Sequence, residues 1–216
     1  MKEEKEVIKK AKAHTIYKVN GKRVPGVTTI LSVLNKPALV KWANNLGLQG
    51  IDSSKYRDEM ADIGTLAHLM ILNYFKGIET DTSDYSKTQI DLAENCLLSF
   101  WEWEKQHKIQ VILAEGQLVS IIYGFGGTID LYCLLDGTPT LVDFKTGKAI
   151  YPEMFYQLAA YKYLLTESCS TLNCRILRIG RSEDEGFEER VVTDTSKQWE
   201  IFQHCLAIYN LKKEVK

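Results

Sequence analysis

Two aspartates and a lysine interrupt an otherwise apolar, strand-like stretch, GTIDLYCLLDGTPTLVDFKTG, residues 127–147. The Asp-Gly pair at 136–137 is typical of a two-residue hairpin turn. With that pair in the turn, Asp130 falls directly opposite Asp143 on the neighbouring strand. Lys145, two residues after Asp143, projects from the same face. The sequence therefore predicts two carboxylates and an ammonium group close together on one face of a sheet.

Two carboxylates at this spacing repel each other, so the fold must compensate for them. In one interpretation Lys145 bridges the acids in a structural salt-bridge cluster, although one lysine cannot neutralise two carboxylates. In a second, one acid is protonated and the pair shares a proton. In a third, a divalent cation, Mg²⁺ or Mn²⁺, lies between the acids, because hard oxygen ligands suit these ions. Lys145 then stands beside the cation as an electrostatic or proton-transfer group.

More polar residues lie in segments that neighbour this hairpin in the sequence. Gln157 and Tyr161 follow it on a predicted helix, four residues apart and therefore on one helix face. Glu115 lies one predicted strand earlier. His68 lies on an earlier predicted helix, one turn after Gly64, whose missing side chain permits a close approach. A lone helical histidine is more often an ordinary core or surface residue, so His68 carries weight only together with the others.

The elements that must position these residues follow from hydrophobic periodicity and turn signals. Tyr74 is expected to face the core, and Thr28 or Thr29 to cap the first helix. The order of elements predicts an α+β domain in which helices flank a mostly antiparallel sheet. The expected elements are a hairpin over 15–24, helices over 27–34, 38–47, 55–76, 86–107, 152–166 and 196–213, three strands within 108–147, and strands over 172–181 and 187–194.

The composition excludes several classes of protein. With 216 residues and 45% hydrophobic content, the chain suits one globular domain. No apolar run is long enough to cross a membrane, and the charged N-terminus lacks the apolar region of a secretory signal. The five cysteines form no CxxC pair, which indicates a reducing compartment rather than a disulfide framework. We therefore expect a cytoplasmic protein, from a bacterium or a phage-infected cell, with no membrane partner.

The charge is unevenly distributed along the chain. The net charge of −1 does not indicate a nucleic-acid-binding protein as a whole. Basic residues nevertheless gather near the N-terminus, which is either a solvated, frayed end or a strip that contacts a polyanion. These residues are Lys2, Lys5, Lys9, Lys10, Lys12, Lys18, Lys22 and Arg23.

The ordered set of motifs resembles the PD-(D/E)xK nuclease superfamily, and within it the RecB-like and Cas4-like exonuclease branch. That branch has a Gly and a His on one helix, a Glu on a strand, GxxD, DxK followed by Thr, and QxxxY. The matching segments here are Gly64-Thr65-Leu66-Ala67-His68, Glu115, Gly127-Thr128-Ile129-Asp130, Asp143-Phe144-Lys145-Thr146, and Gln157 to Tyr161.

The N-terminal part carries a second likeness. The segment 24–31, with Trp42 soon after, is similar to the PSVTxxL segment of mitochondrial genome maintenance exonucleases and related phage proteins. Gly26 replaces the usual serine of that segment. Relatives with an iron–sulfur cluster carry four cysteines at a spacing that this chain lacks, so no iron–sulfur cluster is expected.

The resemblance implies a restriction-endonuclease-like core, a central mixed sheet flanked by helices, and metal-dependent hydrolysis of phosphodiester bonds. One domain is expected over 1–216, with an N-terminal hairpin and helical part over 1–108 and a catalytic sheet core over 109–216. By resemblance, Asp130, Asp143, His68 and the backbone carbonyl of Phe144 would bind Mg²⁺ or Mn²⁺, with Glu115 in a second shell or on a second metal. Lys145 would act on the attacking water or the phosphate, Gln157 would steady the nucleophile, and Tyr161, Thr146, Thr28 and Thr29 would contact substrate.

The expected reaction is exonucleolytic cleavage of DNA, first of all at single-stranded ends. The helices before Glu115 are expected to form a gate over the site, and Trp42, Tyr56 or Tyr74 either stack on bases or belong to the core. An alternative is a duplex end-resecting exonuclease that works with a recombination or single-strand-binding protein in DNA repair. A second alternative is a catalytically inactive nuclease fold that binds DNA.

Overall fold

A computed structural model describes residues 15–167 and 172–215 of the chain. The basic residues from Lys2 to Lys12 lie outside the described residues, so their two interpretations remain open. In the described ranges no helix is both long and apolar enough to cross a membrane.

Seven strands and six helices make up the described chain. The strands are β1 (Tyr17–Val19), β2 (Lys22–Val24), β3 (Ile109–Ser120), β4 (Phe125–Leu135), β5 (Thr138–Lys145), β6 (Asn173–Ile179) and β7 (Phe187–Val192). The helices are α1 (Val27–Leu31), α2 (Pro37–Leu48), α3 (Ser53–Lys76), α4 (Lys87–Glu104), α5 (Pro152–Thr166) and α6 (Ser196–Glu214).

Five strands form one sheet in the order β3-β4-β5-β6-β7, and β1 and β2 form a separate hairpin. Only the β5–β6 pairing is parallel, because α5 carries the chain from the end of β5 back to the start of β6. The other pairings in this sheet are antiparallel. The predicted α+β architecture, a mixed and mostly antiparallel sheet flanked by helices, is confirmed.

The predicted Asp-Gly turn is present, and the predicted hairpin over 15–24 has a turn of the same kind. Asn20 and Gly21 connect β1 to β2 with φ angles of 49° and 76°. Asp136 and Gly137 connect β4 to β5 with φ angles of 52° and 81°, so Leu135 pairs with Thr138 as expected. Positive φ at both positions is the type I′ geometry that suits the twist of a hairpin.

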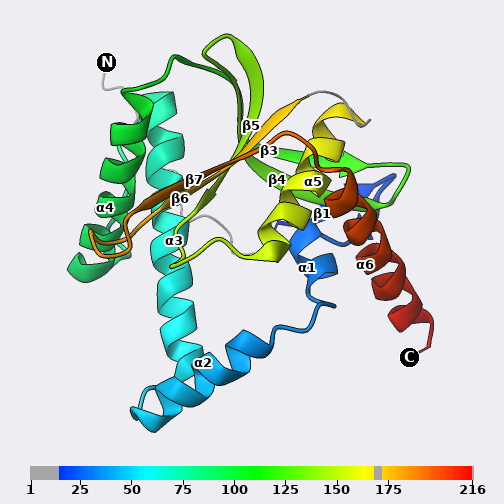
Figure 1. The fold of residues 1–216 in the computed structure, drawn as a ribbon, viewed down its shortest axis with the longest axis horizontal. Helices are drawn as coiled ribbons and strands as arrows, with labels where there is room; N and C mark the ends of the chain where they lie inside the picture. Colours follow the sequence, from blue (N-terminus) through cyan, green and yellow to red (C-terminus); the bar gives the residue numbers. More distant parts are fainter. Residues whose placement is uncertain (1–14, 168–171, 216) are drawn as a thin grey trace, which may run out of the picture.

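Helices cover both faces of the sheet (Figure 1). On one face, α3 and α4 pack on alternate residues of β4 and β5, including Leu131, Val142 and Phe144. On the other face, α1, α5 and α6 pack on residues such as Ile129 and Leu141. The sheet is therefore a middle layer, and Val142 and Phe144 bury their side chains on the face away from Leu141.

Helix α2 differs from the others because none of its residues is buried. It links α1 to α3 at a distance from the sheet (Figure 1). The Lys36 ammonium forms an ion pair of 2.8 Å with Glu153 on α5, and the Trp42 ring lies 6.1 Å from the Tyr56 ring on α3. A contact at its N-cap and one at its middle, rather than a buried face, therefore hold α2 in place.

Two details of the sequence predictions were wrong. Tyr74 is 42% exposed, because the fully buried face of α3 runs through residues such as Ala67 and Ile71. Neither Thr28 nor Thr29 caps α1: the helix starts at Val27, with Gly26 as its N-cap and no side-chain capping bond.

Candidate active site

The two aspartates lie where β4 and β5 separate. Pairing between these strands runs from the turn to Leu131 and Val142 and ends there, one residue before the acids. Beyond that point β4 continues beside β3 as far as Phe125, and β5 continues beside β6 as far as Lys145. The strands therefore form a fork, and side chains from helices on both faces of the sheet can reach it.

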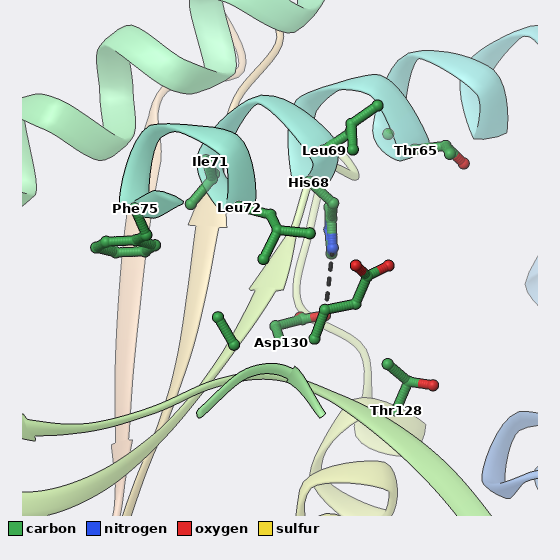
Figure 2. Close-up of a pocket in the computed structure, with 11 residues that line it drawn as sticks. Thr65, His68, Leu69, Ile71, Leu72, Phe75, Thr128 and Asp130 are labelled. Carbon is green, nitrogen blue, oxygen red and sulfur yellow. Dashed lines mark ion pairs between the residues drawn. The ribbon is translucent and has the colours of Figure 1, made fainter. Parts of the chain in front are cut away.

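Asp130 is held from two sides. Its Oδ2 accepts a hydrogen bond of 2.8 Å from the backbone N–H of Phe144, which ties β4 to β5 across the fork. Its Oδ1 lies 3.3 Å from Nδ1 of His68. Figure 2 shows His68 pointing from α3 toward Asp130 on β4. The structure thus brings His68, predicted on a separate helix, into contact with the first aspartate.

Asp143 is almost fully buried, with 1% of its side chain exposed. The Lys145 ammonium lies 2.6 Å from Asp143 Oδ2, so Lys145 turns toward the acids as predicted. Apart from this contact with Lys145, neither Asp143 oxygen has a hydrogen-bond partner among the described residues. A buried carboxylate with one oxygen left unpaired is costly unless a further cation or donor reaches it.

The two acids have opposite pKa shifts. Burial raises the pKa of Asp143 to about 6; the Lys145 charge opposes this, and the Asp130 charge adds to it. Burial also acts to raise the pKa of Asp130, but the charge and contact of His68, with Lys145 and the Phe144 N–H, bring it below its usual value. Burial lowers the pKa of His68, and the Asp130 carboxylate reverses this into a net increase. Asp143 is therefore the acid that lacks compensation.

Tyr161 reaches the fork from α5. Burial, followed by the negative charges of Asp143 and Asp130, raises its pKa well above the usual value, so the phenol keeps its proton. Gln157 Nε2 donates a hydrogen bond of 2.7 Å to the Tyr161 hydroxyl, as their shared helix face predicted. A Cβ on Gly127 would stand 2.6 Å from Cε1 of Tyr161, so this glycine leaves room for the tyrosine ring.

The other motif glycine has a similar role. A Cβ on Gly64 would stand 2.8 Å from Oγ1 of Thr146, a contact that real Cβ atoms do not make. The predicted close approach at Gly64 therefore brings α3 against the residue that follows Lys145. Thr146 is half-buried there.

Glu115 has an unusual backbone for a strand residue. Its φ is 51°, and it falls between the pairs that join Ala114 to Leu131 and Gly116 to Ile129, hence opposite Asp130. A glutamate with positive φ inside a strand is strained, and such strain often occurs at functional sites. The conformation changes the direction in which the exposed Glu115 side chain leaves β3.

A pocket of about 280 Å³ opens beside the fork, between α3 and the β3–β4 strands. His68, Glu115 and Asp130 supply its charged lining, and Leu72 and Phe75 are among its apolar walls (Figure 2). Asp143 and Lys145 do not line it. The pocket therefore gives access to the site from the Asp130 side.

The donor types at the fork fit a hard divalent cation. Two carboxylates and an imidazole belong to the ligands that Mg²⁺ and Mn²⁺ accept, and the unbonded oxygens of Asp143 leave acceptors free. Within residues 15–167 and 172–215, however, no three His, Cys, Asp or Glu side chains converge on one point closely enough to hold a metal. As the side chains stand, Asp130 contacts His68 and Asp143 contacts Lys145. A cation would have to draw the two carboxylates together.

The remaining predicted site residues lie apart from the acids. Thr28 and Thr29 are exposed on α1 and line a second pocket, between the β1–β2 hairpin and α6. Thr128 was not assigned a role from the sequence, although it lies within the GxxD motif. Its hydroxyl lies 2.8 Å from the Tyr17 hydroxyl, and it lines both pockets. No pattern in the sequence joins Tyr17 to Thr128, which are 111 residues apart.

Comparison with known proteins gave similarities at the level of structure only. No protein-family model matches the chain, and no curated protein matches it in sequence. Among solved structures it is similar to an alkaline exonuclease from Laribacter hongkongensis, with 12% identity and a TM-score of 0.44, over 88% of this chain and 87% of that one.

Two further structures belong to the same group of similarities. A putative exonuclease from Eubacterium rectale has 12% identity and a TM-score of 0.49, over 69% of this chain and 65% of that one. The Laribacter exonuclease in complex with dAMP has 13% identity and a TM-score of 0.41, over 74% of this chain and 80% of that one. Because these scores and identities are low, the chemistry of this chain must be inferred from its own side chains.

Proposed function

We propose that the chain is a Mg²⁺- or Mn²⁺-dependent DNA exonuclease that cleaves phosphodiester bonds at single-stranded ends. The observation that carries this proposal is the state of Asp143. It is buried, its pKa is raised to about 6, and the charges of Lys145 and His68 only partly offset its burial and the nearby charge of Asp130. Such an arrangement costs stability in a purely structural cluster, whereas a bound cation would compensate the buried charge.

Asp130, Asp143, His68 and the carbonyl of Phe144 would hold the cation, with Glu115 as a further carboxylate. A bound Mg²⁺ or Mn²⁺ lowers the pKa of water and screens the charge of the phosphate. Of the other interpretations of the acid pair, a salt-bridge cluster leaves Asp143 Oδ1 without a partner among the described residues. A shared proton fits poorly with an ammonium at 2.6 Å, which favours the ionised carboxylate.

Lys145 supplies positive charge at the reacting phosphate. Its side chain is 16% exposed, so its field is only partly screened by solvent. The ion pair with Asp143 fixes the position of Nζ before substrate arrives, and preorganised charge of this kind stabilises a transition state effectively. Its role is to offset the negative charge on the pentacovalent phosphate or to hold the attacking water.

Gln157 and Tyr161 orient the other side of the site. The Tyr161 oxygen accepts a hydrogen bond from Gln157, so the phenolic O–H remains available to donate to another group. Because the pKa of Tyr161 is raised by burial and the two acids, that proton stays on the oxygen at neutral pH. Tyr161 can therefore donate a hydrogen bond to a phosphate oxygen.

The preference for a single strand is supported by α2. This helix buries no residue and bridges α5 to α3 through Lys36 and Trp42. A short helix that is held at its start and middle and buries no residue suits a gate that a flexible strand passes more easily than a duplex. Trp42, at the middle of α2, and Tyr56, near the start of α3, are both half-buried, and bases of a strand can stack on such rings.

One time course tests the proposal. End-labelled linear single-stranded DNA, circular single-stranded DNA and linear duplex are each incubated with Mg²⁺, with Mn²⁺ and with EDTA. We expect metal-dependent loss of the linear single strand, slower loss of the duplex, and intact circles. Preferential loss of the duplex would indicate an end-resecting enzyme instead. DNA binding without cleavage under every condition would indicate an inactive nuclease fold.

A further inference from the structure

The second pocket has a polar lining and a volume of about 510 Å³. It lies between the β1–β2 hairpin and the C-terminal end of α6, two parts of the chain that are nearly 200 residues apart and lie on the same side of the molecule (Figure 1). Threonine and tyrosine hydroxyls supply most of its polar groups. They come from Thr15, Tyr17, Thr28, Thr29, Thr128 and Tyr209.

Two cations enter this pocket from opposite walls. Arg23 comes from β2 and Lys213 from the last turn of α6. Within the part of the chain that the structure describes, neither forms an ion pair with a carboxylate. The Lys213 ammonium lies 4.4 Å from the centroid of the Tyr209 ring, a cation–π distance that restrains a long side chain. With Glu115 as the only carboxylate in the described lining, the pocket carries a net charge of +1 (two cations, one anion).

The wall between the cations and the sheet is firmly held. The Tyr17 ring lies over Gly126, where a Cβ would stand 2.4 Å from the tyrosine Cγ. The Tyr17 hydroxyl contacts Thr128 at 2.8 Å, and Gly26 forms a parallel bridge with Gly126. These contacts seat the hairpin on β4, so Arg23 is presented from a fixed support.

The pocket continues into the fork that holds the acids. Thr128 and Glu115 line both this pocket and the pocket beside Asp130. Thr128 precedes Asp130 by two residues on β4, a separation of about 7 Å along a strand. A strand of DNA with one phosphate at the acids therefore places a neighbouring phosphate at or near the second pocket.

We propose that Arg23 and Lys213 bind the phosphate monoester at the end of a DNA strand and thereby set where the strand is cut. This inference rests on the proposed nuclease function. A terminal phosphate carries up to two charges and several acceptor oxygens, which suits two cations and a ring of hydroxyl donors. An internal phosphodiester has one charge and must leave room for the chain on both sides. The pocket thus favours a phosphorylated end, and the same chemistry is present in a 5′-phosphate and a 3′-phosphate.

Binding and cleavage are measured separately with a fluorescent decathymidylate that carries a 5′-phosphate, a 3′-phosphate or hydroxyls at both ends. In EDTA, anisotropy reports binding without cleavage. We expect one of the two phosphorylated forms to bind about tenfold more tightly than the form with two hydroxyls. The preferred form identifies the end from which degradation starts, and with Mg²⁺ the same end should be degraded faster.

Each cation has a matched control beside it. Arg23→Ala and Lys213→Ala should each abolish most of the preference for the phosphorylated end. Lys22→Ala and Lys212→Ala remove the same charge from exposed neighbours that do not line the pocket, so they should weaken binding of all three oligonucleotides equally and leave the preference intact.

Two outcomes would overturn the inference. One is equal affinity of the wild-type protein for all three oligonucleotides. The other is a loss of preference that is the same in Arg23→Ala as in Lys22→Ala. If the preference holds in EDTA but no oligonucleotide is cleaved with Mg²⁺ or Mn²⁺, the phosphate pocket stands and the proposed nuclease function fails. If cleavage occurs without any end preference, the proposed nuclease function stands and the phosphate pocket fails.

Discussion

Two aspartate–histidine pairs lie at opposite ends of the β4–β5 hairpin. They contain the same residue types but differ in burial and in neighbouring charges. At the fork, Asp130 lies 3.3 Å from His68 and close to the buried Asp143. At the turn, Asp136 lies 2.7 Å from Nδ1 of His107. The same two residue types therefore occur once beside a second acid and once alone.

The turn pair is locally complete. Asp136 Oδ2 contacts His107 Nδ1, and its Oδ1 accepts a hydrogen bond of 2.8 Å from the Lys108 N–H. Its side chain is 48% exposed, so solvent reaches the remaining lone pairs. At the fork, by contrast, Asp143 is buried, and among the described residues only Lys145 contacts its oxygens. The comparison teaches that an Asp–His pair by itself indicates nothing; an uncompensated neighbouring charge is what marks a site.

The largest effect is expected from removing the Lys145 ammonium group at the fork. Lys145→Ala should reduce cleavage of linear single-stranded DNA by about a thousandfold, because preorganised charge at the phosphate is lost. DNA affinity, measured by anisotropy in EDTA, should change little. Lys148→Ala is the matched control: this lysine is exposed, three residues further on, and its removal should leave cleavage nearly unchanged. Full cleavage by Lys145→Ala would contradict the role given to the ammonium.

The next effect concerns metal binding at the two ends of the hairpin. Asp143→Asn should abolish the heat of Mg²⁺ or Mn²⁺ binding in titration calorimetry and the metal-induced increase in Tm. Asp136→Asn removes a carboxylate of the same hairpin and should alter neither. Metal binding that survives in Asp143→Asn and disappears in Asp136→Asn would place the metal ion at the turn and contradict the proposed site at the fork.

The raised pKa of Asp143 can be tested with the same Asp143→Asn variant, by measuring how stability depends on pH. The folded-state pKa of about 6 lies above the usual 3.8, so the metal-free wild type is most stable below pH 3.8 with respect to this group and loses that stability as the pH rises through 6. Each pKa unit corresponds to roughly 1.4 kcal/mol. Chemical unfolding in EDTA should show this loss in the wild type and a smaller one in Asp143→Asn, which lacks the titrating carboxyl group.

The same contrast explains how far the sequence could predict the structure. The Asp-Gly turn determines the register of β4 and β5, because a two-residue turn allows only one pairing of the flanking residues. That register predicts that Asp130, Asp143 and Lys145 lie close together. The separation of the strands one residue before the acids could not be predicted, since it depends on β3 and β6 drawing the two strands apart. Local patterns specify pairs within a hairpin and say little about where a sheet divides.

Helix faces were predicted less well than turns. The 3.6-residue pattern located α3 correctly but placed Tyr74 inward, whereas Tyr74 is 42% exposed and donates a hydrogen bond to Glu104. An aromatic residue at the edge of the apolar face of a helix can point either into the core or toward solvent. The pocket at Arg23 and Lys213 was beyond prediction, because a hairpin and a C-terminal helix meet there through tertiary contacts alone.

A smaller effect is expected from the backbone at Glu115, which has a positive φ as Asp136 does. At Asp136 the hairpin turn requires that conformation and aspartate tolerates it, whereas Glu115 lies inside a strand. Glu115→Asn should raise the stability by about 1 kcal/mol relative to Glu115→Gln, because asparagine enters the left-handed region more easily. Both variants should cleave DNA more slowly than the wild type. Equal stabilities in urea unfolding would mean that the backbone at Glu115 is relaxed.

The smallest effect is expected at the turn, where Asp136→Asn keeps a residue that suits positive φ and removes only the charge. The Lys108 N–H, followed by His107, holds the pKa of Asp136 below 3.8. The stability that the carboxylate contributes is therefore present above pH 3.8 and is lost as the pH falls through the lower, folded-state value. The Tm of Asp136→Asn should lie slightly below that of the wild type near neutral pH and converge with it in more acidic solution, with cleavage unchanged. A Tm difference that stays constant down to about pH 3 would show that the turn needs the shape of aspartate rather than its charge, since only a titrating group produces convergence.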